Sequence, residues 1–281
     1  MPDTSMLAFL APCFAASLIL AGIHAYLGVH VVERGVIFVD LSLAQIAALG
    51  ATIALLMPFS NGDPHAPMVY WISLAFTFMG AFIFSTIRSK RARIPHEAII
   101  GICYAVASAA SILAMSKATS ESEHLKDMLV GNILAVSWPE VAKTAVLYGA
   151  IGAFHFIFRR QFLAISMDHK RTEESGLNVK FWDFLFYASF GFVVTSSVSI
   201  AGVLLVFSYL IVPSVAAMLY ADTIGKRLAI GWTMGTIVSA LGVFLSLKVD
   251  LPTGATIVCT FGLVLIIMAA VRPLIQRHAV S

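Results

Sequence analysis

The chain has few charged residues for its length. Asp, Glu, Lys and Arg make up 12% of its 281 residues, whereas hydrophobic residues make up 59% and the mean hydropathy is +0.92. Soluble domains carry about a quarter charged residues, and one soluble core could not enclose this much apolar surface. The composition therefore predicts a protein embedded in membrane lipid. The net charge of +3 gives no indication of nucleic-acid binding.

Motifs of catalysis and of tight metal binding are also lacking. The three cysteines, Cys13, Cys103 and Cys259, are far apart, and each lies in an apolar run. They form no CxxC pair and have no zinc-finger spacing. No HExxH motif, His-rich run or GxxxxGK[ST] phosphate-binding loop occurs. We therefore expect no dedicated high-affinity metal site, and if ATP drives this protein, another chain must bind it.

Long apolar runs are what the sequence has in abundance. A membrane span needs about 20 apolar residues of helix. Nine segments meet or approach this length: 7–28, 36–57, 67–87, 97–116, 139–158, 183–199, 200–220, 227–247 and 255–271. The first follows Met-Pro-Asp-Thr-Ser, without the basic residues of a cleavable signal peptide, so we expect it to be a membrane span.

The apolar stretch 183–220 is too long for one crossing. Its 38 residues would extend about 57 Å as a helix. We therefore expect two short helices with a break near Ser196–Ser199 and Gly202. Pro213 removes a backbone hydrogen bond and bends a helix. Gly202 and Pro213 thus predict a kink, which serves either as a gate or only to shape the helix.

The basic residues predict the orientation, because Lys and Arg accumulate in cytoplasmic loops. With the 88–96 loop on the cytoplasmic side and the other loops alternating, 14 of the 18 basic residues fall inside. These are Arg34, Arg88, Lys90, Arg91, Arg93, Arg159, Arg160, Lys170, Arg171, Lys180, Lys226, Arg227, Arg272 and Arg277. The pattern predicts nine spans, with the N-terminus outside and the C-terminus cytoplasmic. Eight spans plus a re-entrant or interfacial helix is the alternative.

The cytoplasmic loop 159–182 has the pattern of a short surface helix. Asp168 can cap it, Glu173 and Glu174 follow in its first turns, and Gly176 can end it. Such a segment is either a solvated connector or a docking helix for a cytoplasmic partner.

Five stretches resemble permeases of the metal-ion class of ABC transporters (ABC-3), which carry zinc, manganese or iron. The short helix that ends in ESGLNV resembles the coupling helix of that class. The other stretches resemble, in chain order, its second helix, the loop before its fifth helix, a segment with proline and small residues, and the turn before its last helix. They are RGVIFVDLSLAQIAALGATIAL (34–55), LVGNILAVSW (129–138), AGVLLVFSYLIVPSVAAML (201–219) and DLPTGATIV (250–258).

The resemblance implies an all-α transmembrane bundle like that of the vitamin B12 permeases, with residues 1–281 forming one permease domain. It implies the permease subunit of an ATP-driven importer of divalent metal ions, zinc first and manganese or iron next, in a prokaryotic plasma membrane. Such a subunit would be a transport component and not an enzyme, without a cofactor of its own. A cytoplasmic ATP-binding subunit, an extracytoplasmic metal-binding protein and a second copy of the chain would be its partners. The residues that would couple to the ATP-binding subunit lie near 168–176: Asp168, Glu173, Glu174 and Gly176.

Asp40 and Gln45 are the candidate residues of the ion path, because polar groups within a span are costly and mark function. They lie five residues apart, about 140° around a helix. Many members of the class have an acid and a histidine four apart, with a glycine five residues after the histidine. Gln45 stands five before Gly50 and takes the histidine's place, although an amide is a poorer zinc ligand than imidazole. Hydrogen bonding between helices is the alternative role.

Three other functions are weaker alternatives. A secondary transporter driven by an ion gradient would show inverted repeats and more buried charge. An intramembrane protease would need a paired-Asp, Ser/His or HExxH site, and Asp40 is the one clear acid inside a predicted span. An ABC permease for a metal chelate such as cobalamin or a siderophore is usually longer than this chain.

Overall fold

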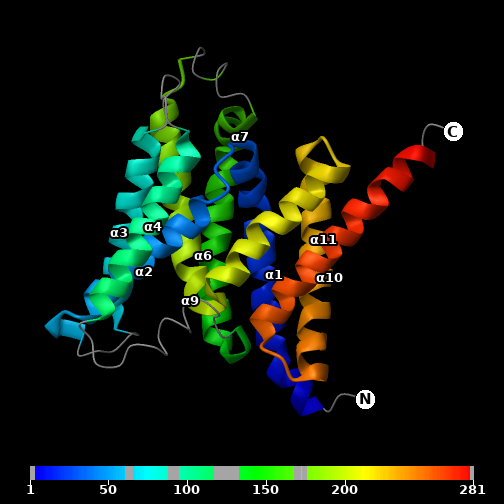
Figure 1. The fold of residues 1–281 in the computed structure, drawn as a ribbon, viewed down its shortest axis with the longest axis horizontal. Coiled ribbons are helices and arrows are strands. Elements are labelled where there is room, and N and C mark those ends of the chain that lie inside the picture. The colour runs from blue at the N-terminus through cyan, green and yellow to red at the C-terminus, as the bar shows by residue number, and fades with distance from the viewer. Residues whose placement is uncertain are drawn as a thin grey trace. The chain divides into compact units, whose positions relative to one another are not determined.

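The structure is a computed structural model that describes residues 4–60, 66–87, 95–116, 133–167, 172 and 176–278 (Figure 1). All regular elements in these residues are helices, which agrees with the all-α class that the composition predicts. The chain divides into two compact units. Unit 1 comprises Met1–Val32, Leu129–Ala150 and Ile200–Ser281, and unit 2 comprises Glu33–Met128 and Ile151–Ser199.

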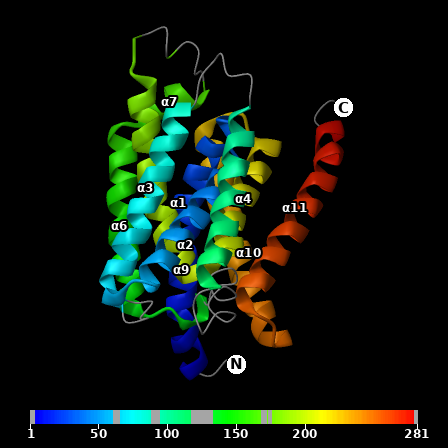
Figure 2. The same ribbon diagram turned by 60° about the vertical axis from the view of Figure 1, so that its left-hand side comes forward.

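Unit 2 is built around α2 (Val39–Leu55), which packs against α3 (Pro67–Ile87) and α4 (His96–Met115). Figure 1 and Figure 2 both show these three helices side by side. Small residues let the backbones approach closely. A Cβ atom at Gly50 of α2 would lie 2.9 Å from Phe76 of α3, and one at Gly80 of α3 would lie 2.9 Å from Ile46 of α2. The small residues of α2 thus serve packing within the chain.

Unit 2 also contains the short helix α7 (Arg159–Met167), the end of α6 (Trp138–Ile157) and the beginning of α9 (Val179–Tyr220). A cluster of aromatic side chains joins them: the Phe162 ring meets that of Trp182 edge-on, with centroids 5.5 Å apart, and the buried His155 ring stacks on Phe162 at 4.2 Å. These contacts fix α7 against the start of α9, on either side of the 168–176 segment.

Unit 1 holds α1 (Thr4–Glu33) up to Val32, the beginning of α6, the end of α9, α10 (Ile224–Val249) and α11 (Thr253–His278). The indole N–H of Trp232 in α10 donates to the carbonyl of Gly22 in α1 at 2.9 Å. A Cβ atom at Gly235 would lie 2.9 Å from the Cβ of Ala21, so α10 and α1 touch closely there. α10 also packs against α11, which leans across it in Figure 1. Two short 3₁₀ turns, η1 (Pro58–Ser60) and η2 (Ile133–Ala135), complete the described elements.

The predicted count of nine spans is not confirmed. Within the described residues, six helices are long and apolar enough to cross a membrane: α1, α3, α4, α9, α10 and α11. The pair α6 and α7, bent by 75°, would be a seventh if it formed one span. The difference arises because α2 has only 17 residues, and because α9 is counted as one helix here although its backbone is broken at Gly202.

The predicted break in α9 is confirmed at Gly202 and wrong at the serines before it. Gly202 has φ 75° and ψ 160°, a backbone conformation that is essentially restricted to glycine. Ser196–Ser199 remain helical, and their serine hydroxyls bond to carbonyls of the preceding turn, as Ser197 does to Val193 at 2.6 Å. The break therefore lies at Gly202 and not at the serines.

Candidate functional site

The two candidate residues of α2, Asp40 and Gln45, lie on different sides of the helix. Leu43, Ile46 and Gly50 face α3, as their contacts with Gly80 and Phe76 show. Asp40 lies beside this stripe and is 1% exposed, whereas Gln45 lies on the far side of the helix and is half-buried. The structure therefore keeps Asp40 and Gln45 apart, in agreement with the separation of about 140° that their spacing predicts.

Asp40 is a buried carboxylate that lacks a hydrogen-bond partner among the described residues. Both of its oxygen atoms are inaccessible to water and unbonded, and the same holds for the hydroxyl of Ser42. Burying an ionised carboxylate without a counter-charge is costly. A cation that reached Asp40 would supply the missing charge, so the residue has the properties of a cation contact.

Glu97, which the sequence analysis does not single out, lies at the same end of α2. Its Oε1 accepts a hydrogen bond of 2.9 Å from the backbone N–H of Phe38, two residues before Asp40. Its Oε2 is buried and unbonded in the described structure. The described residues contain no group of three or more His, Cys, Asp or Glu side chains that could hold a metal ion. The beginning of α2 thus offers carboxylate oxygens without a closed coordination cage.

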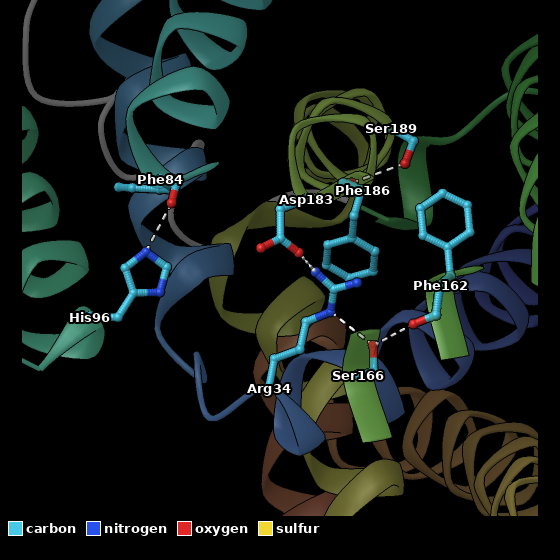
Figure 3. Close-up of polar contacts among 8 residues, drawn as sticks. All are labelled: Arg34, Phe84, His96, Phe162, Ser166, Asp183, Phe186 and Ser189. Atoms are coloured by element: carbon cyan, nitrogen blue, oxygen red, sulfur yellow. Dashed lines mark hydrogen bonds and ion pairs between the residues drawn. The ribbon is translucent and has the colours of Figure 1, made fainter. Parts of the chain in front are cut away.

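Arg34, in the connection between α1 and α2, contacts several side chains of unit 2 (Figure 3). Its side chain is fully buried, and Nη1 donates to Asp183 Oδ1 at 2.6 Å. Nε donates to the hydroxyl of Ser166 at 2.9 Å. The guanidinium carbon lies 3.9 Å from the centroid of the Phe186 ring, a cation–π geometry. We call Arg34, Asp183, Ser166 and Phe186 the Arg34 clamp.

The Arg34 clamp holds both ends of the predicted coupling segment. Ser166 lies at the end of α7, directly before 168–176, and Asp183 and Phe186 lie in the first turns of α9, directly after it. Arg34 itself lies six positions before Asp40 along the chain. One guanidinium therefore connects the two flanks of the coupling segment to the beginning of α2.

Most of the coupling segment cannot be compared with the prediction. Asp168, Glu173 and Glu174 lie outside the described residues. Thr172 is helical and buried. Gly176 forms an exposed turn with φ 82°, a left-handed conformation that ends helices. Docking of a partner at this segment stays a prediction.

The predicted kink residues both lie in α9. Gly202 breaks the helix, and Pro213 is buried inside it eleven positions later. The backbone at Gly202 is the sharper feature, since Pro213 lies within residues that keep helical structure. Their use as a gate stays a prediction.

Two histidines near the clamp are structural. In Figure 3, the Nε2–H of His96 donates to the carbonyl of Phe84 at 3.0 Å, which ties the start of α4 to α3. Nε2 of His155 lies 2.8 Å from the hydroxyl of Ser189. Both side chains thus fasten neighbouring helices of unit 2.

A protein-family model, that of the ABC 3 transport family, matches residues 6–272. The chain belongs to this family. It is therefore a multi-pass membrane protein of a family of metal transport components, and the predicted family is confirmed.

Curated relatives of this ABC 3 family member are named for manganese and iron. The manganese transport system membrane protein MntC of Listeria monocytogenes is 25% identical over 250 residues, covering 89% of this chain and 86% of the relative. The chelated iron transport system membrane protein YfeD of Yersinia pestis is 24% identical over 224 residues, covering 76% and 75%. The chain thus matches most of the length of both relatives.

Solved structures share its fold. The PsaBC complex of Streptococcus pneumoniae with a Fab contains a chain with a TM-score of 0.76 and 24% identity, over 92% of this chain and 90% of that one. An inward-facing putative metal-chelate type ABC transporter has a TM-score of 0.71 and 18% identity, over 96% and 89%. The helical arrangement described above is therefore that of ABC transporter permeases.

Proposed function

We propose that this chain is the membrane-spanning permease subunit of an ATP-driven importer of divalent transition-metal ions. The match of the ABC 3 family model over residues 6–272 carries this proposal. The buried, unbonded carboxylate of Asp40 supports it, because ionisable groups inside membrane helices mark the paths of ions. The permease supplies the path, and no covalent chemistry takes place on it.

We place manganese and ferrous iron ahead of zinc as the transported ion. Carboxylate and carbonyl oxygens suit Mn²⁺, whereas zinc prefers imidazole and thiolate. The polar side chains of α2 are Asp40, Ser42, Gln45 and Thr52, which offer oxygen donors and neither imidazole nor thiolate. The relatives reported above are named for manganese and iron, which agrees with this order. Zinc, which the sequence analysis puts first, stays an untested prediction.

ATP hydrolysis in a partner subunit drives transport, and the 168–176 segment transmits the resulting motion to the membrane helices. In this proposal the ATP-binding subunit docks on that segment, an extracytoplasmic metal-binding protein delivers the ion, and a second copy of the chain completes the path. Through Ser166 and Asp183, Arg34 contacts both flanks of the segment, and Arg34 itself lies in the connection that leads into α2. A push on the segment therefore reaches the helix that carries Asp40, as in rigid-body switching.

Uptake by proteoliposomes tests this function. The chain is reconstituted with its candidate ATP-binding subunit and metal-binding protein, and uptake of Mn²⁺, Fe²⁺ and Zn²⁺ is measured with and without ATP. We expect ATP-dependent uptake that Asp40→Asn reduces at least tenfold. Asp250→Asn is the matched control, since Asp250 is exposed at the left-handed end of α10, a conformation that Asn tolerates. Uptake without any ATP-binding subunit would contradict the proposal and favour a secondary transporter.

A further inference from the structure

A groove between α10 and α11 is the feature of unit 1 that the proposed function does not use. It has a volume of about 420 Å³ and is lined by α10 from Ala229 to Leu241 and by Val264 and Met268 of α11. Thr233 is the one hydroxyl-bearing residue of the lining, and its hydroxyl is occupied by a 2.7 Å bond to the carbonyl of Ala229. The walls of the groove are therefore apolar.

The length of the groove matches one leaflet of a bilayer. Ala229 and Leu241 are twelve positions apart, which is about 18 Å along a helix. The hydrocarbon core is about 30 Å thick, so each leaflet contributes about half of that. Ile237 is 60% exposed and Leu241 42% exposed, so the groove is open along its side. An extended chain of methylene groups fits such a furrow.

Basic residues lie at one end of the groove. Lys226 precedes Ile230 by one helical turn, and Arg272 follows Met268 by one turn, so helical register places both on the groove side of their helices. Because α10 and α11 are consecutive and packed together, the start of one and the end of the other lie at the same end. This end therefore carries positive charge above an apolar furrow.

Two hydrogen bonds build this basic end. The Tyr220 hydroxyl donates to the carbonyl of Met268 and thereby ties the end of α9 to the groove wall. Nε of Arg227 donates to the carbonyl of Ala221 at 2.9 Å. Nε of Arg272 is buried and has no hydrogen-bond partner among the described residues. Asp222, exposed on the turn before α10, is the one acidic residue in the sequence of 220–249, and 253–278 contains none.

We propose that this groove binds an anionic phospholipid, with an acyl chain along α10 and the phosphate between Lys226 and Arg272. Basic pockets between transmembrane helices are suited to anionic head groups. A second copy of the chain is the other occupant to consider. In a two-fold contact both copies would present the same patch, so their basic ends would add like charge, whereas an anionic lipid supplies the opposite charge.

Lipid titration of the purified full-length chain tests the proposal. Phosphatidylglycerol or phosphatidylcholine with identical acyl chains is added in detergent, and bound lipid is counted by native mass spectrometry alongside the apparent melting temperature. We expect phosphatidylglycerol to bind and raise the melting temperature by several degrees more than phosphatidylcholine. Lys226→Gln with Arg272→Gln should abolish the difference. Lys248→Gln, an exposed lysine at the opposite end of α10, should preserve it.

A second variant tests the groove without changing its charge. Ala229→Phe fills the furrow and should reduce phosphatidylglycerol binding at least fivefold, while soluble glycerol phosphate should have no effect on the unaltered chain. Equal binding of both lipids, or undiminished phosphatidylglycerol binding in the double glutamine variant, would overturn the proposal. The proposal would also be overturned if Ala229→Phe retained lipid binding but changed from two copies to one, as measured by light scattering. The groove would then be a contact between copies of the chain.

Discussion

At the scale of single residues, the Arg34 clamp is a buried charge held by several partners at once. The ion pair with Asp183 is joined by the bond to Ser166 and by the ring of Phe186. Breaking a buried pair by removing one partner costs about 3–5 kcal/mol, whereas replacing both by apolar residues is often neutral. Stability and motion can therefore be separated experimentally at this site.

Paired substitution of the clamp should uncouple ATP hydrolysis from uptake. Asp183→Asn alone should lower the apparent melting temperature, because it removes the carboxylate that pairs with the buried Arg34 guanidinium. Arg34→Met combined with Asp183→Leu should recover most of that loss. In reconstituted transporter we expect this double variant to retain ATP hydrolysis and lose most uptake. Lys180→Met, an exposed change in the same turn of α9, is the control for both measurements. Native uptake by the double variant would leave the clamp a purely structural role.

The sequence predicts some of these residues and not others for a physical reason. Asp40 can be recognised from the sequence without knowledge of its neighbours, because burying an acidic side chain within an apolar run costs free energy wherever the helix packs. In the sequence, Arg34 is only one of the basic residues that the charge pattern assigns to the cytoplasmic side, since its partner Asp183 lies 149 residues away. Glu97 is hidden in the same way at the edge of a predicted span. Partners at such separation become apparent only in the folded chain.

At the scale of elements, α9 shows how a single residue decides where a long helix divides. Serines and Gly202 indicate a break equally well in the sequence, but hydroxyls that bond to the preceding turn leave the helix intact. The conformation of Gly202 costs other residues of order 1–3 kcal/mol. The length of 183–220 predicts that a division exists, and backbone geometry selects its position.

Substitution of Gly202 should therefore lower the stability of the protein, even though glycine has no side chain whose contacts could be lost. We expect Gly202→Ala to lower stability by about 1–3 kcal/mol, through strain at positive φ. The apparent melting temperature of the purified chain measures this. Gly262→Ala in α11 is the matched control, because a Cβ there meets nothing within 4 Å and alanine favours a helix interior. If the two variants melt alike, the break at Gly202 does not depend on glycine.

At the scale of the whole molecule, composition predicts the helical membrane class and the charge pattern predicts its orientation. The helices occur close to the predicted runs, since about 20 apolar residues leave little alternative in lipid. The number of crossings is harder to predict, because α2 is short and α6 and α7 form a bent pair. Hydropathy gives the length of an apolar run, but it does not show whether the helix formed by that run crosses the membrane.

The orientation can be tested with labelled single cysteines. In a chain whose Cys13, Cys103 and Cys259 are replaced, we expect Asp250→Cys to react with a membrane-impermeant maleimide added to intact cells. Lys226→Cys, at the other end of α10, should react only after the membrane is made permeable. Labelling of both positions from the same side would contradict the predicted crossing of α10, and the reverse pattern would invert the whole topology.

Unit 1 is assembled from three segments that are far apart in the sequence, and this has a consequence for the biosynthesis of the protein. α1 leaves the ribosome first, yet the Trp232 indole that bonds to its Gly22 carbonyl is made 210 residues later. During translation α1 must therefore wait in lipid, or beside an insertase, without its α10 neighbour. A truncated or stalled chain would leave this helix unaccompanied. Membrane quality-control proteases would then have their earliest opportunity at α1, so the abundance of the protein depends on how rapidly its last helices arrive.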